Sequence, residues 1–448
     1  MPGGFRLLAD IGPLRESAAF RRLLVGSTLS SVGSSLTGFA VMLQIYNLTR
    51  SPFAVGALGV AAMVPTLAVG LLGGSVTDTT DRRKLVLITS SVLALISATL
   101  AAQAFAGLRQ LWLLYGLVAV QSAFAAIDRP ARSTFIPNLL SPAQLSAGLA
   151  LNRISFQIVL TVGPALAGII AGAPHLGLRG CYLVDAATYA AALYAVARLP
   201  VMRPQSGTRR PGLRAVAEGA AYIHRHQAIA GAFLADLSAT VFGLPIALFP
   251  AINAERFGGN PRTLGLFTAA IGVGGLVSAV LSGPVRHISR QGLAMLCTVA
   301  VWGAAFAGFA VVSSLWLTLT LLGVAGAADT FTVVFRGIIV QAGTPDEFQG
   351  RVMAADYVVG AGGGQLGSLE SGALGSLTTP VISALSGGLL TIVGTIAIAL
   401  LLPGFARYRR EAPDPATESP QAAVATAVKS DAARPDAAET DAAGVAKI

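Results

Sequence analysis

The sequence predicts an all-α membrane protein whose twelve transmembrane helices form two six-helix repeats. Three observations support this fold class: the scarcity of charge, the grouping of apolar residues into long segments, and an internal repeat. Of the 448 residues, 54% are hydrophobic and 12% are charged, and the mean hydropathy is +0.69. Soluble domains carry about 25% charged residues. Because so few charges cannot cover a surface in water, we expect most of the chain to lie in a lipid bilayer.

The apolar residues form twelve segments, each near the roughly 20 residues that cross about 30 Å of hydrocarbon. Lipid requires every backbone polar group to find its partner within its own segment, and no strand-like alternation is present, so each segment is predicted to be a helix. A glycine run at 360–367 weakens the eleventh segment. The helices are expected near 22–48, 53–77, 85–106, 111–134, 150–173, 180–199, 228–253, 263–285, 292–312, 315–337, 353–376 and 379–402.

Basic residues mark alternate loops and thereby predict the orientation. With the amino terminus in the cytoplasm, 26 of the 31 Lys and Arg residues lie on the cytoplasmic side, as the positive-inside rule requires. Both termini are therefore predicted to be cytoplasmic, in a multi-pass protein of the cell membrane with an uncleaved amino-terminal lead. The net charge of +10 follows from this topology. Because the arginines are spread over alternate loops and not along one face, no nucleic-acid partner is expected.

An internal repeat divides the chain into two halves of the same topology. Residues 51–78 align without gaps with residues 260–287, at an offset of 209, and Gly56 matches Gly265. The segments that follow the fourth and tenth spans also resemble each other, at an offset of 203. The predicted organisation is a cytoplasmic lead (1–21), a first half (22–199), a cytoplasmic linker in which a short helix can form after Gly212 (200–227), a second half (228–402) and a disordered cytoplasmic tail (403–448).

The turn after the second span, "GLLGGSVTDTTDRRKLVL" at 70–87, is the most polar stretch between two spans of the first half. It resembles the signature Gly-x-x-x-Asp-Arg-x-Gly-Arg-(Arg/Lys) of the major facilitator superfamily, although Thr79 replaces its first arginine and Asp81 its second glycine. That superfamily is also built from parallel six-span repeats, with substrate bound near the midplane between them. The resemblance implies a cytoplasmic gate, and the alternative is a solvated loop. The matching residues are Gly74, Asp78, Arg82 and Arg83.

Within the superfamily, the chain resembles the enterobactin exporter type over nearly all of residues 15–410. The likeness includes "AFRRLL" before the first span, the turn "TRSPFAVG" and "IVQAGTPDEFQGRV" after the tenth span. In the fifth span, Gly163, Pro164 and Gly168 resemble the Gly-Pro-x-x-Gly-Gly motif of drug:proton antiporters, with Ala167 in place of one glycine. Macrolide and multidrug efflux proteins share much of this pattern. The resemblance therefore implies export, of a siderophore or alternatively of drugs.

Ionisable residues deep in the predicted spans are candidates for proton coupling, because such groups are costly in a membrane. Counted at about 1.5 Å per residue, Asp236 and Asp329 lie about 12 Å and Glu370 about 9 Å from the nearer end of their spans. The alternative is a structural hydrogen bond to a neighbouring helix. Asp185 and Asp356, nearer to span ends, are expected to be interfacial.

Asp128 and Arg132 form a further candidate pair for proton transfer, near the cytoplasmic end of the fourth span. Drug exporters of the superfamily often carry an arginine there, and the resemblance makes Arg132 its counterpart. Pro130 lies between the two residues and would free backbone carbonyls beside them. The alternative is a basic cap on the helix with a local salt bridge.

Other function classes lack the residues that they need. The three lysines, Lys84, Lys429 and Lys447, do not follow a glycine, so there is no Walker A loop. The four histidines form no HExxH pattern, and Cys181 and Cys297 suit core packing, so neither a metal site nor another cofactor is expected. The sequence therefore predicts a non-enzymatic secondary exporter whose partners are a small molecule, protons and lipid. A receptor or scaffold without flux is the remaining alternative.

Overall fold

The computed structural model describes residues 10–72, 81–200, 213–281, 283 and 288–409. Within these residues all regular structure is helical, and eleven helices are long and apolar enough to cross a membrane. One further long helix, α16, is less apolar and contains the glycine run. The predicted all-α membrane fold is confirmed, and the described helices agree with the predicted count of twelve.

The transmembrane helices follow one another through short turns. They are α2 (Ala18–Thr49), α3 (Pro52–Leu72), α5 (Arg82–Phe105), α6 (Leu111–Ser133), α8 (Pro142–Ala171), α9 (Gly177–Ala197), α11 (Gln227–Phe242) continued by η1 (Ile246–Leu248) and α12 (Phe249–Arg256), α13 (Pro261–Leu281), α14 (Gln291–Val311), α15 (Leu315–Gly343), α16 (Asp346–Leu377) and α17 (Pro380–Leu401). The shorter helices are α1 (Gly12–Glu16), α7 (Phe135–Leu139), α10 (Leu213–Arg225) and α18 (Pro403–Ala406).

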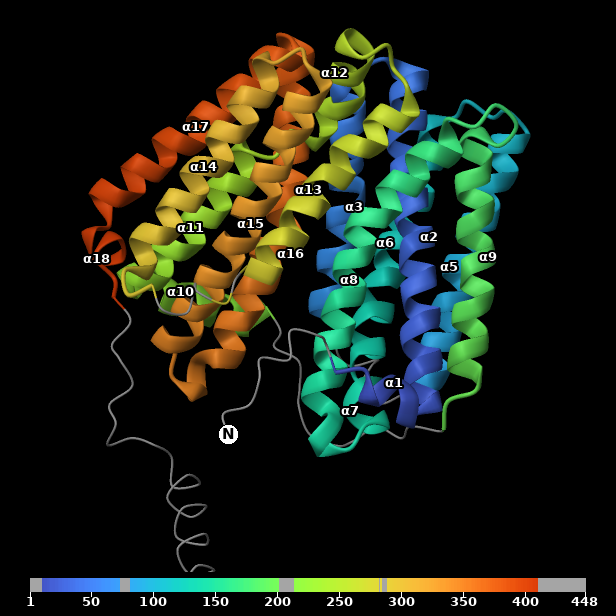
Figure 1. The fold of residues 1–448 in the computed structure, drawn as a ribbon, viewed down its shortest axis with the longest axis horizontal. Helices are drawn as coiled ribbons and strands as arrows, with labels where there is room; N and C mark the ends of the chain where they lie inside the picture. Colours follow the sequence, from blue (N-terminus) through green and yellow to red (C-terminus); the bar gives the residue numbers. More distant parts are fainter. Residues whose placement is uncertain (1–9, 73–80, 201–212, 282, 284–287, 410–448) are drawn as a thin grey trace, which may run out of the picture. The chain divides into compact units, whose positions relative to one another are not determined.

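The helices pack as two bundles with the same internal pattern (Figure 1). In the first bundle α2 packs on α9, α3 on α6 and α5 on α9. The corresponding helices of the second bundle repeat these pairs as α11 with α17, α13 with α15 and α14 with α17. Between the bundles, α3 packs against α16 and α8 against α13. This pattern matches the predicted pseudo-repeat.

Local chemistry at the helix ends explains where several helices begin. Ser17 accepts a hydrogen bond from the backbone of Phe20 and caps α2, and Asp81 accepts one from the backbone of Arg83 and caps α5. Thr379 caps α17 in the same way, just before a proline at the first helical position. Such side chains satisfy backbone N–H groups that have no partner inside the helix.

The seventh segment is broken, where the sequence predicted one span over 228–253. α11 ends at Phe242, and the chain passes Pro245 before it resumes as η1 and α12. A proline cannot donate a backbone hydrogen bond and disfavours helix in the residue before it. Nε1 of Trp302 donates to the carbonyl of Ala239 at 3.2 Å and so satisfies one acceptor at the break. Non-helical backbone at membrane depth is tolerated where it is buried in protein or lines a cavity.

The glycine run of α16 is a packing surface and does not interrupt the helix. A Cβ atom added to Gly363 would lie 2.7 Å from Oγ1 of Thr240 on α11. Absence of side chains therefore lets two transmembrane helices approach closely. The cytoplasmic end of the same helix contacts α10, the helix expected after Gly212, through an ion pair of 2.9 Å between Arg351 and Glu218.

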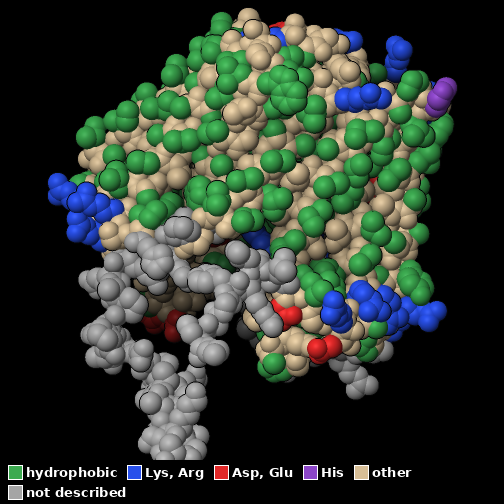
Figure 2. All heavy atoms as spheres, in the orientation of Figure 1, with side chains coloured by type: hydrophobic (Ala, Val, Ile, Leu, Met, Phe, Trp, Pro, Cys, Tyr) green, Lys and Arg blue, Asp and Glu red, His purple; other side chains and the backbone are tan. Residues whose placement is uncertain are grey.

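The surface agrees with a protein that spans a membrane. Figure 2 shows hydrophobic side chains spread over the helical face, while Lys and Arg side chains lie toward the helix ends. Large apolar side chains such as Leu95 and Trp316 are 67% and 80% exposed. In water such exposure would be unfavourable, whereas lipid solvates these groups.

Candidate functional site

A cavity lies between the two bundles and has two adjoining compartments of about 880 and 440 Å³. Ligand pockets typically measure about 300–1,000 Å³, so each compartment can hold a small organic molecule. The larger compartment is lined by α3, α6 and α16, and the smaller also by α2, α8, η1 and α13. Four residues line both compartments: Ala62, Ser122, Arg129 and Gln365. The broken seventh segment therefore forms part of the cavity wall.

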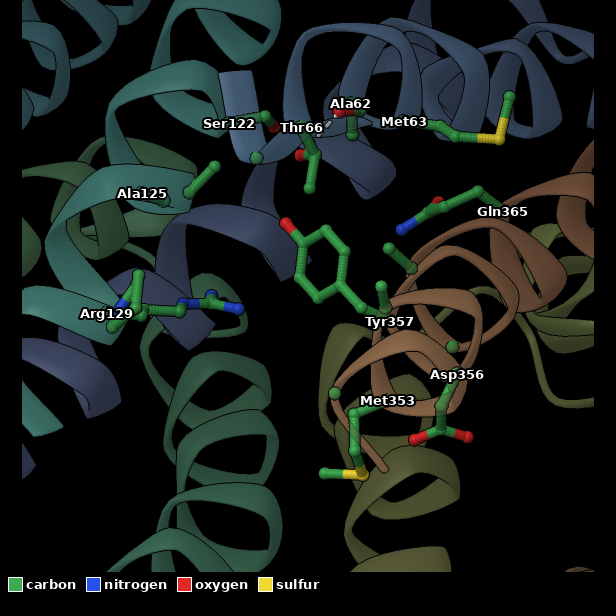
Figure 3. Close-up of a pocket in the computed structure, with 17 residues that line it drawn as sticks. Ala62, Met63, Thr66, Ser122, Ala125, Arg129, Met353, Asp356, Tyr357 and Gln365 are labelled. Atoms are coloured by element: carbon green, nitrogen blue, oxygen red, sulfur yellow. Dashed lines mark hydrogen bonds between the residues drawn. The ribbon is translucent and has the colours of Figure 1, made fainter. Parts of the chain in front are cut away.

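The larger compartment is mostly apolar and contains a few polar groups (Figure 3). Met63 and Met353 supply flexible apolar surface from α3 and α16. The hydroxyl of Tyr357 points from α16 across the cavity toward α3 and α6, and Arg129 extends into it from α6. Asp356 lies at the α16 side. An apolar wall with a few oriented polar groups is the usual composition of a small-molecule site.

Closely packed glycines close the cavity at the end of the bundles that carries the α2–α3 turn and α12. A Cβ atom on Gly265 of α13 would lie 2.6 Å from the carbonyl oxygen of Pro164, and one on Gly168 would lie 2.7 Å from that of Pro261. On the other side, a Cβ atom on Gly372 of α16 would lie 2.6 Å from the carbonyl oxygen of Pro52. Helix backbones therefore touch across the two halves.

These contacts include the antiporter-like motif of α8. Pro164 and Gly168 face α13 in the other half, whereas Gly163 packs against Ser35 of α2 within its own half. Sequence reasoning identified the motif through resemblance only. The structure adds that two of its three residues lie at the contact between the halves.

Asp128 and Arg132 form a charged network inside the first half. The two side chains form an ion pair one turn apart on α6. Arg132 also donates to Ser90 of α5 at 2.7 Å and to Ser27 of α2 at 3.2 Å, while Thr89 donates to Asp128 at 2.6 Å. The pair predicted from sequence is therefore present, and it joins three helices.

A second charged cluster lies in the second half, where α11, α15 and α16 meet. Nη1 of Arg336 lies 2.9 Å from Oδ2 of Asp236 and 3.1 Å from Oδ1 of Asp356. Asp329, about two turns before Arg336 on α15, interacts electrostatically with both Asp236 and Arg336. One guanidinium thus faces three carboxyl groups, a set named below the acidic cluster. A single cation balances one of these negative charges, so the cluster has the composition of a proton-binding site.

The two networks occupy corresponding positions of the repeat. Ser27 and Asp236 are 209 residues apart in the sequence, and each contacts the arginine of its own half. Those arginines, Arg132 and Arg336, are 204 residues apart. The second half therefore places an acid where the first half places a serine. This exchange concentrates negative charge in the second half.

The remaining predicted site residues separate from these networks. Glu370 lies on α16 beyond the acidic cluster and has no hydrogen bond or ion pair with the described residues. Gly74 and Asp78 of the gating motif lie outside the described residues. Arg82 begins α5, and Arg83 donates to the carbonyl of Ala197 at the carboxy-terminal end of α9, where the helix dipole favours a cation.

Asp185 and Asp356 differ from the sequence expectation of interfacial positions. Asp185 has no exposed surface, and its Oδ2 accepts hydrogen bonds of 2.6 Å from both Thr37 of α2 and Ser97 of α5. Its Oδ1 has no hydrogen-bond partner within the described chain. Asp356 pairs with Arg336 and lines the cavity. Counting residues from a span end cannot reveal which way a side chain points into the bundle.

Replacing Asp185 with alanine is expected to destabilise the first half. The substitution leaves two buried hydroxyl groups without their acceptor, which costs about 1–3 kcal/mol. Asp185→Asn keeps an acceptor oxygen and is the matched control, with a smaller loss expected. Thermal unfolding of the purified chain in detergent measures the difference. Equal melting temperatures for wild type and the alanine variant would show that these bonds do not stabilise the bundle.

Comparisons with known proteins agree with this architecture. The chain matches the family described as transmembrane secretion effector over residues 9–434. It is 27% identical over 410 residues to the enterobactin exporter EntS of Citrobacter koseri, which covers 91% of this chain and 97% of that protein. It is 25% identical over 407 residues to EntS of Escherichia coli, which covers 91% of this chain and 97% of that protein.

Solved structures share the fold at low sequence identity. The nucleoside transporter NupG superposes with a TM-score of 0.68 and 15% identity, over 87% of this chain and 100% of that chain. A bacterial homologue of the iron transporter ferroportin in an inward-facing state superposes with a TM-score of 0.65 and 16% identity, over 87% of this chain and 98% of that chain. At these identities the likeness concerns the fold alone.

Proposed function

This chain belongs to the transmembrane secretion effector family of the major facilitator superfamily, and from that premise we propose that it is a proton-coupled secondary exporter that works by alternating access. The observation that carries the proposal is the cavity between the halves, closed at one end by glycine contacts and bordered by the acidic cluster through Asp356. A cavity between two repeats that rock against each other is the arrangement that alternating access requires.

The direction of transport follows from the predicted orientation. With both termini in the cytoplasm, the end closed by glycines faces outward, and the end near α1, α7 and α10 faces the cytoplasm (Figure 1). The cavity would then receive its substrate from inside the cell. Separation of α3 from α16 and of α8 from α13 would release the substrate outside. We propose the cytoplasmic membrane of the cell as the location.

The proposed coupling site is the acidic cluster. Asp236 and Asp329 are the residues that we propose to bind and release protons, and Arg336 limits how many of the three acids stay charged. Asp356 belongs to both the cluster and the cavity wall, so a change in its ion pair would communicate the protonation state to the substrate. Asp128 and Arg132 are proposed as a second proton-transfer element in the first half, and Glu370 as an independent one.

A siderophore is the proposed substrate, because the curated relatives reported above are enterobactin exporters. Deleting the gene from its host and assaying the spent medium for iron-free siderophore tests this directly. We expect siderophore to accumulate in the cells and to fall in the medium. Unchanged siderophore in the medium would contradict the assignment.

A multidrug or macrolide efflux antiporter is the second candidate. The observation that favours it is the cavity wall, in which Met63 and Met353 offer flexible apolar surface suited to ligands of different shapes. New sensitivity of the deletion strain to macrolides or dyes, with normal siderophore secretion, would select this alternative.

Asp78→Asn is expected to reduce transport several-fold, because we propose that this carboxylate pairs with a neighbouring helix end when the cytoplasmic side closes. A charge near a helix terminus contributes about 0.3–1 kcal/mol, up to about 2 when partly buried. Initial transport rate at equal protein amount in the membrane is the measurement. A rate equal to that of wild type would mean that the turn serves only to anchor topology.

A further inference from the structure

Arg129 is the basic side chain that enters the cavity. Among the described residues that line the two compartments, it is the one Lys or Arg, and it borders both compartments. Figure 3 shows its side chain extending from α6 into the space between α6 and α16. It is exposed and forms no hydrogen bond or ion pair with the described residues. A guanidinium so placed is available to a molecule in the cavity.

The neighbouring acids are committed to other arginines. Asp128, adjacent in sequence, is buried and pairs with Arg132, which also holds two serine hydroxyls. Asp356, on the opposite wall, pairs with Arg336 at 3.1 Å. Neither acid lies within ion-pair distance of Arg129. The positive charge of Arg129 is therefore the one that a ligand meets at the α6 wall.

The groups around Arg129 define the shape of the complementary ligand. Ser122 lies about two turns earlier on the same face of α6, and Gln365 reaches the cavity from α16. Both provide hydrogen-bond donors near the guanidinium. The rest of the wall near these residues is apolar, with Met63 and Met353 on opposite sides. The arrangement suits a molecule with acidic oxygens at one end and an apolar body at the other.

We propose that the cavity binds its substrate as an anion, whose carboxylate or phenolate oxygens contact the guanidinium of Arg129 while its apolar body packs against Met63 and Met353. This inference rests on the proposed export function and narrows its substrate class to amphipathic organic anions. Arginine presents several N–H donors in one plane and binds such oxygens in a bidentate manner. Partial exclusion of water by the apolar wall strengthens the interaction.

The test measures binding of three matched probes to the full chain in nanodiscs. The probes are 1-pyrenebutyrate, 1-pyrenebutanol and 1-pyrenebutylamine, which share the apolar body and differ in charge. Empty nanodiscs provide the blank for partition into lipid. We expect wild type to bind the butyrate about tenfold more tightly than the alcohol, since hydrogen bonds to charged groups are the stronger class, and to bind the amine most weakly.

Variants assign the preference to the guanidinium. Arg129→Gln is expected to weaken butyrate binding about tenfold and to leave binding of the alcohol unchanged, which also shows that the chain is folded. Arg129→Lys keeps the charge and should retain part of the preference. Arg153→Gln is the matched control, because Arg153 is an exposed arginine of α8 that lines neither compartment.

Three results would overturn the inference: no binding of the butyrate to wild type, equal or weaker binding of the butyrate than of the other probes, or an unchanged anion preference in Arg129→Gln. The result is separable from the proposed function. A chain with gradient-driven flux but no anion preference contradicts this inference alone, and a chain with the preference but no gradient-driven flux contradicts the proposed function alone.

Discussion

Replacing Gly265 with valine is expected to reduce transport to less than about a tenth of the wild-type rate. Even a Cβ atom at this position would lie 2.6 Å from the carbonyl oxygen of Pro164 and 2.9 Å from Cα of Gly168, both backbone atoms of α8. Overpacking of this kind costs about 1–3 kcal/mol, which as a difference between two states corresponds to about 5–150-fold. The variant should therefore leave the state that is closed at the outer end.

Two measurements establish the cause of that loss. Transport is assayed in proteoliposomes, and outer access is assayed with a membrane-impermeant maleimide on Thr268→Cys, a cavity position, in a chain whose Cys181 and Cys297 are replaced. We expect faster labelling when Gly265 is valine. Gly116→Val is the matched control, because a Cβ atom there meets no atom within 4 Å. Wild-type transport and unchanged labelling in the Gly265 variant would contradict the assignment of this contact as the outer gate.

Arg336→Gln is expected to abolish gradient-driven transport and to lower thermal stability. The side chain of Arg336 is 15% exposed and that of Asp236 is 9% exposed, and removing one partner of a buried ion pair costs about 3–5 kcal/mol. The three carboxyl groups of the acidic cluster would then face one another without a cation. Melting temperature and initial transport rate are measured on the same preparation.

A double substitution separates folding from coupling. Adding Asp236→Asn to Arg336→Gln removes a buried charge and should recover much of the melting temperature, while transport stays independent of the proton gradient. Arg351→Gln is the matched control, because that arginine is 41% exposed in its pair with Glu218, and exposed pairs contribute about 0–1 kcal/mol. Full proton-driven transport by Arg336→Gln would exclude the acidic cluster as the coupling site.

The fold was predictable from sequence because membrane spans are written in composition. Hydropathy and the 209-residue repeat were sufficient for the helices and their duplication. The interruption between α11 and α12 was not, since a hydropathy window passes over Pro245 and records only apolar residues. The course of α16 was predicted with less certainty for the opposite reason, because its glycines lower hydropathy and yet form a tight contact with α11.

The candidate site was predictable only where its residues are neighbours in sequence. Asp128 and Arg132 are one helical turn apart, so their pairing follows from spacing. Arg336 was counted only as a cytoplasmic base, because its partner Asp236 lies 100 residues earlier. The burial of Asp185 depends on Thr37, which is 148 residues away. A signal for such pairs exists in the repeat, since Asp236 stands where Ser27 stands and both reach the conserved position of an arginine in their halves.

Transport into proteoliposomes under an imposed proton gradient tests proton-coupled export most directly. Vesicles with an acidic lumen, and with the chain oriented cytoplasmic side outward, are given an iron-free siderophore or a macrolide. We expect accumulation that a protonophore abolishes and that Asp236→Asn and Asp329→Asn reduce. Movement that is the same with and without the gradient, or no movement of any siderophore or drug tested, would contradict proton-coupled export.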